Sequence, residues 1–493
     1  MDQPLKILFL AAEMVPFAKT GGLADVIGAL PHALRALGHD VRVALPRYRR
    51  VDAERFGLTP LLPHFSVSFY TFSLDAAMRQ CLLAAEGRTD DALPVYFIEN
   101  DPFFDRDGLS MYDDDADRYI FFCRAALEGV RALGWCPDVI HCHDWQTAIV
   151  PNWLTTIFQS DQFFARTASV YTIHNLAYQG AFGQRVLEIA GVAEETYVMT
   201  SARPGGDDMV RLMARGIQHA DVVTTVSPTY AREILTPEYG EGMETLLAQR
   251  AARLFGVLNG IDVQRYNPAA DPYIAAQFDT DHLDGRIACK AALQRAFGLP
   301  ERPQTPVIGA ISRLTDQKGF DLLDAVIQPL LRDHDLQLVI LGTGHQRYHE
   351  RLSALRAHYP ERLATAFTFN ATLAHQIYAG ADVFLMPSRF EPCGMGQLIA
   401  LRYGAIPLVR ATGGLADTVA DCGDGTCGDG FVFSEYTPEA LLATIQRALG
   451  IYADAPLWRG VMRRAMAMDW SWAASARAYV ELYETALADR RAQ

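Results

Sequence analysis

Strand-length apolar runs alternate with amphipathic stretches of helix length along most of the chain. Residues 5–12 are apolar except for Lys6, residues 23–37 repeat apolar positions at helical spacing, and residues 40–45 are typical of a second strand. Strand, helix and strand in this order predict a βαβ unit, in which a right-handed crossover joins parallel strands. Similar runs predict further strands at 138–142, 168–172 and 221–226.

The same alternation starts again in the second half of the chain. Between the halves, the strand pattern stops in a stretch that contains Pro268 and Pro272, which indicates a domain boundary. Beyond it, strands are predicted at 307–311, 337–341, 362–369, 383–386 and 405–409. We therefore predict an α/β protein with doubly wound domains at 1–257 and 276–470, a linker at 258–275, and a C-terminal helix at 471–493 that crosses back to the first domain.

Composition narrows the class of protein. A chain of 493 residues with 50% hydrophobic residues is expected to form a globular protein of two domains. The net charge of −14 argues against binding to nucleic acid or to an anionic membrane. The eight cysteines include no CxxC pair, so free thiols in a reducing cytoplasm are the simplest interpretation. Glu13 ends the first apolar run too early for a signal peptide, and no segment reaches transmembrane length.

Several predicted strand-to-helix loops carry candidate binding groups. In the first half, Lys19, Thr20, Gly21 and Gly22 directly precede a predicted helix, where backbone amides and a cation suit a phosphate. The alternative interpretation is an ordinary glycine turn. In the second half, Arg313 and Lys318 occupy the first such loop; they either bind a diphosphate or form a solvated basic turn.

Two His residues and an acidic group end the strand at 138–142. His141 and His143 share one face of that strand, and Asp144 follows it. Two His ligands on one strand are too few for a convincing zinc site, so we interpret Asp144 as a sugar-hydroxyl acceptor or a helix cap. The acidic run 113–117 is interpreted as a solvated turn in preference to a metal-binding DxD. After the next strand, His174 is a general acid or base, a hydroxyl-binding residue or an ordinary loop histidine.

The loop after the strand at 383–386 is the strongest candidate site. Glu391 lies there beside Pro392, and a helix is predicted to begin near Gly394. Open α/β sheets bind ligands at the carboxyl ends of their strands, and the first turn of a helix offers free amides to an anion. Taken alone, Glu391 would be interpreted as a solvated loop carboxylate. The glycine-containing loop at 412–414 follows the next strand.

Eight segments together resemble bacterial glycogen (starch) synthases. In chain order they are KTGGLADVIGALPHAL (19–34), HCHDWQTAIVP (141–151), YTIHNLAYQG (171–180), TTVSPTYAREI (224–234), LNGIDVQRYNP (258–268), ISRLTDQKGFDLL (311–323), SRFEPCGMGQL (388–398) and TGGLADTV (412–419). They occur in the family's order over essentially the whole chain. The resemblance implies the GT-B fold, in which two Rossmann-like domains face each other across a cleft. It also implies transfer of glucose from ADP-glucose to an α-1,4-glucan with retention at C1, without a cofactor or a metal.

The resemblance also implies roles for individual residues. The expected catalytic positions are Glu391, His174, Lys318, Arg313 and Asp144. The expected ADP-glucose-binding positions are Lys19, Gly21, Gly22, Asn259, Arg313, Lys318, Phe369, Cys393, Gly394, Met395, Gly396, Thr412, Gly413 and Gly414. Of these, the three cations match the diphosphate positions, and Asp144, His174 and Asn259 match residues that line the donor glucose. No second carboxylate is placed for a double displacement, so Glu391 is expected to stabilise an oxocarbenium-like ion pair during front-face attack.

Three departures from the family pattern stand out. Met395 and Gly396 occupy positions where the family usually has Leu and Thr, and Phe369 replaces a usual Tyr that stacks on adenine. The acidic loop around Tyr112 is shorter than in typical members. A second Glu eight residues after the first, common in the wider retaining class, is absent because that position is Ile399.

Four other functions are alternatives to glucan synthesis from ADP-glucose. A glucan phosphorylase would share the fold but needs pyridoxal phosphate on a lysine. A nicotinamide dehydrogenase would need a strand leading into G-x-G-x-x-G, which the sequence lacks. A non-catalytic glucan-binding protein would not need Lys19, Lys318 and Glu391 together. A related retaining glucosyltransferase that uses another nucleotide sugar stays open.

Overall fold

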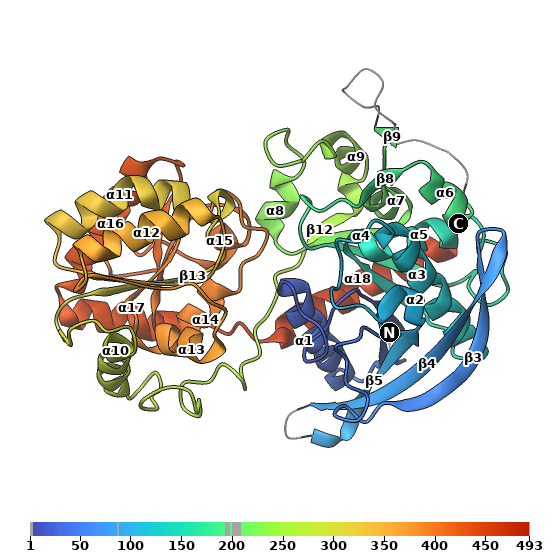
Figure 1. Ribbon diagram of the computed structural model, residues 1–493, viewed down its shortest axis with the longest axis horizontal. Helices are drawn as coiled ribbons and strands as arrows, with labels where there is room; N and C mark the ends of the chain where they lie inside the picture. Colours follow the sequence, from blue (N-terminus) through green and yellow to red (C-terminus); the bar gives the residue numbers. More distant parts are fainter. Residues whose placement is uncertain (1–2, 86–87, 193–197, 200–208, 493) are drawn as a thin grey trace. The chain divides into compact units, whose positions relative to one another are not determined.

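Two sheets, each in its own unit of the chain, organise the computed structural model (Figure 1), which describes residues 3–492 except 86–87, 193–197 and 200–208. The N-terminal unit consists of Met1–Val226, Ala231–Asn259 and Trp472–Gln493. The C-terminal unit consists of Ser227–Tyr230 and Gly260–Ser471. The α/β class and the two Rossmann-like domains predicted from the sequence are confirmed.

The N-terminal sheet has the strand order β12-β11-β7-β6-β1-β2-β5-β4-β3. Its parallel part comprises β1 (Lys6–Leu10), β2 (Asp40–Pro46), β5 (Arg88–Glu99), β6 (Val139–His143), β7 (Ala168–Ile173), β11 (Val222–Thr225) and β12 (Leu254–Gly256). Strands β1 and β6 are neighbours in space although long segments separate them in sequence, so the chain reverses its direction of winding between them.

A long antiparallel hairpin extends this sheet. Strands β3 (Thr59–Phe69) and β4 (Phe72–Ala85) pair with each other, and β4 pairs with β5. The β-rich run at 65–74 is divided between these two strands, because the chain turns within it. The turn passes through Tyr70, whose φ is +56°. Since no Gly or Asn marks it, the pattern gave no sign of a turn. A separate small sheet contains β8 (Ala181–Gly183), β9 (Val198–Met199) and β10 (Met209–Arg211).

The helices of the N-terminal unit cover its sheet or fill the connections. They are α1 (Gly22–Ala36), α2 (Asp101–Phe104), α3 (Asp115–Ala132), α4 (Asp144–Thr147), α5 (Ile149–Thr155), α6 (Arg185–Ala190), α7 (Leu212–His219), α9 (Glu244–Gln249), the 3-10 turn η1 (Ala251–Arg253) and α18 (Trp472–Ala492). Helix α8 (Pro228–Glu233) contains residues of both units.

The C-terminal helix α18 packs on the N-terminal unit, as predicted. Arg490 near its end forms a buried ion pair with Asp221, at 2.8 Å, and the same carboxylate oxygen accepts hydrogen bonds from the backbone and side chain of Ser169. At the start of the helix, Ser475 Oγ donates to the Leu258 carbonyl at 2.6 Å. This buried ion pair and the hydrogen bond of Ser475 hold the two ends of α18 on the N-terminal unit.

The C-terminal sheet is parallel throughout, with the order β15-β14-β13-β16-β17-β18. Its strands are β13 (Val307–Ile311), β14 (Gln337–Leu341), β15 (Leu363–Ala366), β16 (Val383–Met386), β17 (Ile406–Arg410) and β18 (Phe431–Phe433). Its helices are α10 (Gly285–Ala296), the 3-10 turn η2 (Asp316–Lys318), α11 (Phe320–Asp333), α12 (Gln346–His358), α13 (Ala371–Gly380), α14 (Gly396–Tyr403), α15 (Gly413–Thr418), α16 (Pro438–Tyr452) and α17 (Ala455–Ala467).

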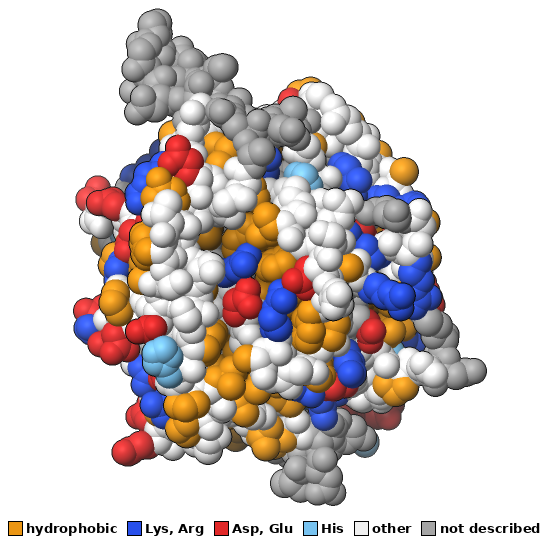
Figure 2. Space-filling model, turned by 90° about the vertical axis from the view of Figure 1, so that its right-hand side faces the viewer, with side chains coloured by type: hydrophobic (Ala, Val, Ile, Leu, Met, Phe, Trp, Pro, Cys, Tyr) orange, Lys and Arg blue, Asp and Glu red, His pale blue; other side chains and the backbone are white. Residues whose placement is uncertain are grey.

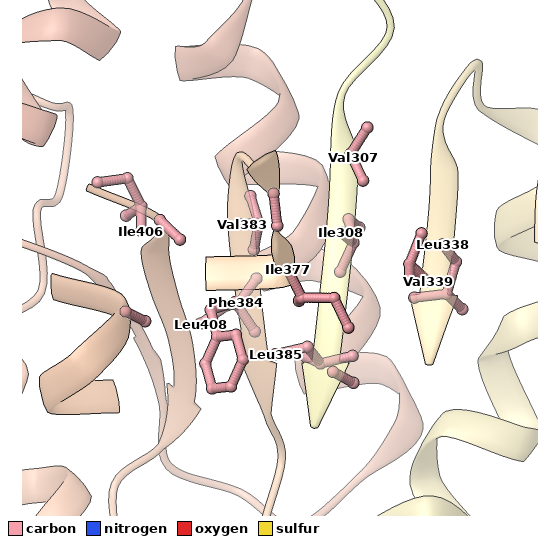
Figure 3. Packing of buried hydrophobic residues seen from close by; sticks show 14 of the residues in the cluster. Val307, Ile308, Leu338, Val339, Ile377, Val383, Phe384, Leu385, Ile406 and Leu408 are labelled. Atoms are coloured by element: carbon pink, nitrogen blue, oxygen red, sulfur yellow. The ribbon is translucent and has the colours of Figure 1, made fainter. Parts of the chain in front are cut away.

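Continuous apolar strands form the core of the C-terminal unit. Side chains of neighbouring strands, among them Ile308, Val383 and Leu408, lie together in Figure 3, and Ile377 of α13 packs against them. A strand covered by helices on both faces needs apolar residues at consecutive positions, which is why these runs were visible in the sequence.

The predicted end of one strand in this unit is wrong, and the predicted start of α14 is confirmed. Strand β15 ends at Ala366, not at residue 369, because Phe367 turns away to stack on His349, at 4.4 Å between ring centroids, and Asn370 caps α13. Helix α14 begins at Gly396, close to the predicted start near Gly394, which itself has a left-handed φ of +72°.

Both sheets place candidate loops where the winding direction changes. In the C-terminal unit, β13 and β16 pair in parallel, so the loop that contains Lys318 and the loop that contains Glu391 leave the same edge. In the N-terminal unit, β1 and β6 also pair in parallel, so the loop that contains Lys19 and the loop that contains Asp144 leave one edge of that sheet. These are the places where doubly wound sheets bind ligands.

Positive and negative side chains are mixed on one face of the molecule. On the face drawn in Figure 2, Lys and Arg side chains are interspersed with Asp and Glu, unlike the one-sided basic surface of a nucleic-acid-binding protein. Among the residues with described positions, no helix combines the length and the apolar character needed to cross a membrane.

Candidate functional site

Glu391 is buried and paired with a lysine. Its Oε2 lies 2.5 Å from Lys318 Nζ, and the two side chains are 7% and 17% exposed. Ser388 Oγ donates to the same oxygen at 3.1 Å. The interpretation of Glu391 as a solvated loop carboxylate is therefore wrong, and a fixed carboxylate and a fixed cation lie side by side at the edge of the C-terminal sheet.

The backbone of two glycines makes this pairing possible. Gly319, directly after Lys318, has a φ of +76°, and a Cβ there would lie 2.0 Å from the Pro387 carbonyl oxygen. Gly413 has a φ of +45°, and its Cβ would lie 2.0 Å from the carbonyl oxygen of Glu391. Both positions therefore require glycine for conformation and for space. The loops on either side are thus held against the Glu391 loop.

The loop at 412–414 positions Glu391 through backbone contacts. The Gly414 amide lies 3.1 Å from the carbonyl oxygens of both Glu391 and Pro392. Thr412 is buried and is the N-cap residue of α15. These contacts give Gly413 and Gly414 a structural role in addition to the phosphate role implied by the resemblance.

Residues 393–396 form the approach to α14. Cys393 is buried, and Gln397 Nε2 donates to the carbonyls of Cys393 and Gly394, at 3.0 Å each. Met395 is the N-cap residue of the helix. A Cβ at Gly396 would lie 3.1 Å from the ring of buried Phe384. The threonine usual in the family would therefore require this ring to shift.

Two other predicted residues of the unit are exposed. Arg313 lies on the surface and donates to Gln317 Oε1 at 3.1 Å. Phe369, in the loop after β15, is 87% exposed. The ring is therefore accessible to a ligand. Because parallel strands end at one edge, Phe369 follows a strand of the same edge as Glu391.

In the N-terminal unit, Glu13 organises the Lys19 loop. Its carboxylate is buried and accepts hydrogen bonds from the backbone and the hydroxyl of Thr20, the latter at 2.8 Å, and from the Gly21 amide. Burial raises the pKa of the Glu13 carboxyl. Two amides of this loop are therefore already used within the protein. Gly22 is the first residue of α1, and the Lys19 ammonium pairs with Asp25 at 2.6 Å.

Asp144 and His174 contact each other at the carboxyl ends of β6 and β7. Asp144 Oδ1 accepts a hydrogen bond from the His174 amide at 2.8 Å, and Asp144 has a φ of +52°. Burial raises the pKa of the Asp144 carboxyl to about 7 and lowers the pKa of the His174 imidazole to about 3. His174 is therefore neutral near pH 7, which disfavours an imidazolium general acid and agrees with a general base or a hydroxyl-binding residue.

The two histidines of β6 are hydrogen-bonded within the protein. His141 Nδ1 lies 2.8 Å from Tyr483 Oη and its Nε2 lies 2.6 Å from Thr172 Oγ1. His143 Nδ1 lies 3.0 Å from His174 Nε2. Their side chains share one face, as predicted, with ring centroids 4.1 Å apart. Within the described part of the chain, no group of three or more His, Cys, Asp or Glu residues is placed to hold a metal ion.

The acidic run near Tyr112 is engaged in ion pairs. Asp114 pairs with Arg106 at 2.6 Å, and Asp115 pairs with buried Arg118 at 2.7 Å. This local structure replaces the solvated turn that the sequence suggested.

Asn259 follows β12 at the edge that also carries Asp144 and His174. It is 7% exposed, and its Oδ1 is buried without a hydrogen-bond partner among the described residues. An unpaired buried acceptor is costly, so this oxygen is a candidate for a ligand contact.

Sequence reasoning missed three polar residues of these sites. Glu13 was used only to end an apolar run, and Asp25 and Ser388 were not considered. Asp25 lies in the first turn of a predicted helix and Ser388 lies three residues before Glu391, so their positions in the candidate loops were the available signal.

Comparisons with known proteins agree along the whole chain. The family described as "Starch synthase catalytic domain" matches residues 6–249, and "Glycosyl transferases group 1" matches residues 294–453. The chain is 50% identical to a glycogen synthase of Moorella thermoacetica, an alignment that covers 100% of this chain and 99% of that protein. It is 48% identical to a glycogen synthase of Desulforudis audaxviator, over 99% of this chain and 97% of that protein.

Solved structures show the same fold. The catalytic domain of starch synthase IV from Arabidopsis thaliana, bound to ADP and acarbose, superposes with a TM-score of 0.88 at 34% identity, covering 99% of this chain and 100% of that one. A sucrose-phosphate synthase from Thermosynechococcus elongatus, at 17% identity and a TM-score of 0.59, shares the fold.

The raised pKa of Asp144 predicts a pH-dependent stability. The folded state holds this proton up to about pH 7, whereas the ordinary value is 3.8. The stabilisation of the folded state by the proton on Asp144 is therefore complete below pH 3.8 and is lost as the pH rises to 7. Relative to Asp144→Asn, the unfolding free energy of the wild type should fall by up to about 4 kcal/mol across this interval, measured by chemical denaturation at several pH values.

The exposed residue Asp113 supplies the control. Asp113→Asn shows how the same replacement acts at a residue that is not buried. A difference between the wild type and Asp144→Asn that stays constant over the interval would contradict the burial of an Asp144 proton.

Proposed function

Because this chain belongs to the glycogen and starch synthase family of glycosyltransferases, we propose that it transfers glucose from ADP-glucose to the non-reducing 4-OH of an α-1,4-glucan, with retention at C1. The observation that carries the proposal is the buried group of Lys318, Glu391 and Ser388 at the winding reversal of the C-terminal sheet. The Arabidopsis starch synthase bound to ADP and acarbose supports the choice of donor and acceptor.

The proposed reaction needs no covalent intermediate on the protein. The bond between C1 and the β-phosphate oxygen breaks, and ADP leaves with the bonding electrons. The acceptor O4 forms the new bond to C1 on the same face, and its proton passes to the departing phosphate oxygen. Atoms and charges balance without a redox partner, and the protein stabilises the separated charges.

Each cation has a place in that scheme. Lys318 and Arg313 would neutralise the diphosphate as negative charge grows on it, and by the resemblance Lys19 would do the same. Lys318 already contacts Glu391, so the carboxylate would remain beside the developing oxocarbenium while the lysine is shared with phosphate. Glu391 then acts through its charge and not as a nucleophile.

Neutral groups of the N-terminal unit suit the sugar. Asp144, His174 and Asn259 would bind hydroxyl groups of the donor glucose, which carries no charge for them to neutralise. The neutral His174 ring and the unpaired Asn259 Oδ1 can form hydrogen bonds with sugar hydroxyls without adding a charge to the site. We also propose that the protein works in the cytoplasm, where ADP-glucose and glycogen would be available to it, without a cofactor or a metal ion.

The function is tested by incorporation of labelled glucose into glycogen. We expect incorporation from ADP-glucose with much lower incorporation from UDP-glucose, and we expect the rate to survive EDTA because protein cations neutralise the diphosphate. A preference for another nucleotide sugar would overturn the assignment of the donor. Loss of activity in EDTA with recovery in Mg²⁺ or Mn²⁺ would overturn the metal-free scheme.

Replacement of Glu391 tests its charge. Glu391→Gln keeps the shape and the hydrogen-bond acceptor for Lys318, so ADP should bind with a Kd within about threefold of the wild type while kcat falls by about a hundredfold or more. Exposed Glu435 supplies the control variant Glu435→Gln, which should be unaffected. Lys318→Ala should lose more in kcat than in affinity for ADP-glucose. A near-normal kcat in Glu391→Gln would refute its role.

Phe369 is proposed to stack on adenine. Phe369→Ala should weaken ADP binding by about 1 kcal/mol or more, as measured by titration calorimetry. Phe369→Tyr keeps the ring and restores the residue usual in the family, so it should bind ADP like the wild type. An unchanged Kd in Phe369→Ala would show that this exposed ring does not contact the base.

A further inference from the structure

A row of buried rings leads from the C-terminal helix to His174 within the N-terminal unit. Tyr483 of α18 contacts His141, the His141 and His143 rings lie 4.1 Å apart, and His143 Nδ1 lies 3.0 Å from His174 Nε2. Phe9 of β1 stacks on His143, at 5.4 Å and an interplanar angle of 19°. His141 and His143 have no exposed surface, so the protein alone determines which of their nitrogens carry hydrogen.

The unpaired nitrogen of His143 indicates its tautomer. His143 Nε2 is buried without a hydrogen-bond partner among the described residues. If Nε2 carried the hydrogen, a buried N–H donor would be left unsatisfied, which is rarer in proteins than an unsatisfied acceptor. The hydrogen therefore belongs on Nδ1, from which His143 donates to His174 Nε2.

This hydrogen bond determines the tautomer of the next ring. A neutral His174 that accepts at Nε2 must carry its own hydrogen on Nδ1. Among the residues that the structure describes, Nδ1 of His174 has no hydrogen-bond partner, so it is available as a donor.

We propose that His143 is a positioning residue that holds His174 as an Nδ1–H donor for a hydroxyl oxygen of the donor sugar. This inference rests on the proposed function for the identity of the sugar. The contacts of His141 with Tyr483 and Thr172 fix the ring beneath His143, so α18 supports the site although it lies at the other end of the sequence.

A matched pair of variants tests the positioning role. At position 143, Asn places an amide nitrogen close to the position of the histidine Nδ1. Leu has nearly the same shape as Asn but no hydrogen-bond donor. His143→Leu should lower kcat/KM for ADP-glucose by about tenfold or more, and His143→Asn should recover most of this loss. The KM for glycogen should stay within about twofold in both.

A merely structural role for His143 predicts a different pattern. Both variants would then lose thermal stability and activity in parallel, and the glycogen KM would change as much as the ADP-glucose parameters. Equal impairment of His143→Asn and His143→Leu, or wild-type kinetics in His143→Leu, would overturn the proposal.

NMR of the ¹⁵N-histidine-labelled wild type tests the tautomers without any substrate. Two-bond and three-bond couplings, assigned with single His variants, should show hydrogen on Nδ1 of both His143 and His174. Hydrogen on Nε2 of His174 would refute the proposal even if ADP-glucose is the donor. If NMR shows the expected tautomers but the protein does not use ADP-glucose, only the proposed function is refuted.

Discussion

The parallel pairing of β13 with β16 is the constraint on which the C-terminal site depends. Ile308 pairs with Val383 and Gly309 pairs with Phe384, so two loops that are 73 residues apart at Lys318 and Glu391 leave the sheet at one edge. The resulting ion pair is buried, and a buried charge is tolerated only with a close partner and further hydrogen bonds. The tight backbone contacts at Gly319 and Gly413 follow from this requirement, because the loops must approach to within van der Waals contact.

The strand-end site of Lys318 and Glu391 and that of Asp144 and His174 treat ionisable groups in opposite ways. In the C-terminal unit, Lys318 and Glu391 form a charged pair. In the N-terminal unit, burial lowers the pKa of His141, His143 and His174 and raises the pKa of Asp144, so the neutral forms are favoured. This contrast fits the proposed division of labour, in which charge acts on the diphosphate and the oxocarbenium while neutral groups orient sugar hydroxyls.

The family comparisons and the site geometry are independent of each other. The match over the full chain identifies a glycogen synthase-like glycosyltransferase, whereas the distances identify which side chains contact one another at the candidate site. Glu13 is an example of what geometry adds, since its three hydrogen bonds hold the loop that contains Lys19.

The sequence by itself determined the architecture and the loops that carry the candidate site. Strands β13, β14 and β16 have the bounds predicted from their apolar runs, because a strand buried on both faces is apolar at most positions. Gly342 follows β14 and Pro387 follows β16, whereas β13 is followed by a polar residue, Ser312. The return of α18 was also predicted. Only the tertiary structure decided that Ser388 and Lys318 share Glu391 Oε2, that Phe369 lies beyond its strand, and that Tyr483 supports His141 across 342 residues. Local patterns report the burial of whole elements, whereas the partner and the charge state of a polar group depend on residues that only the fold brings together.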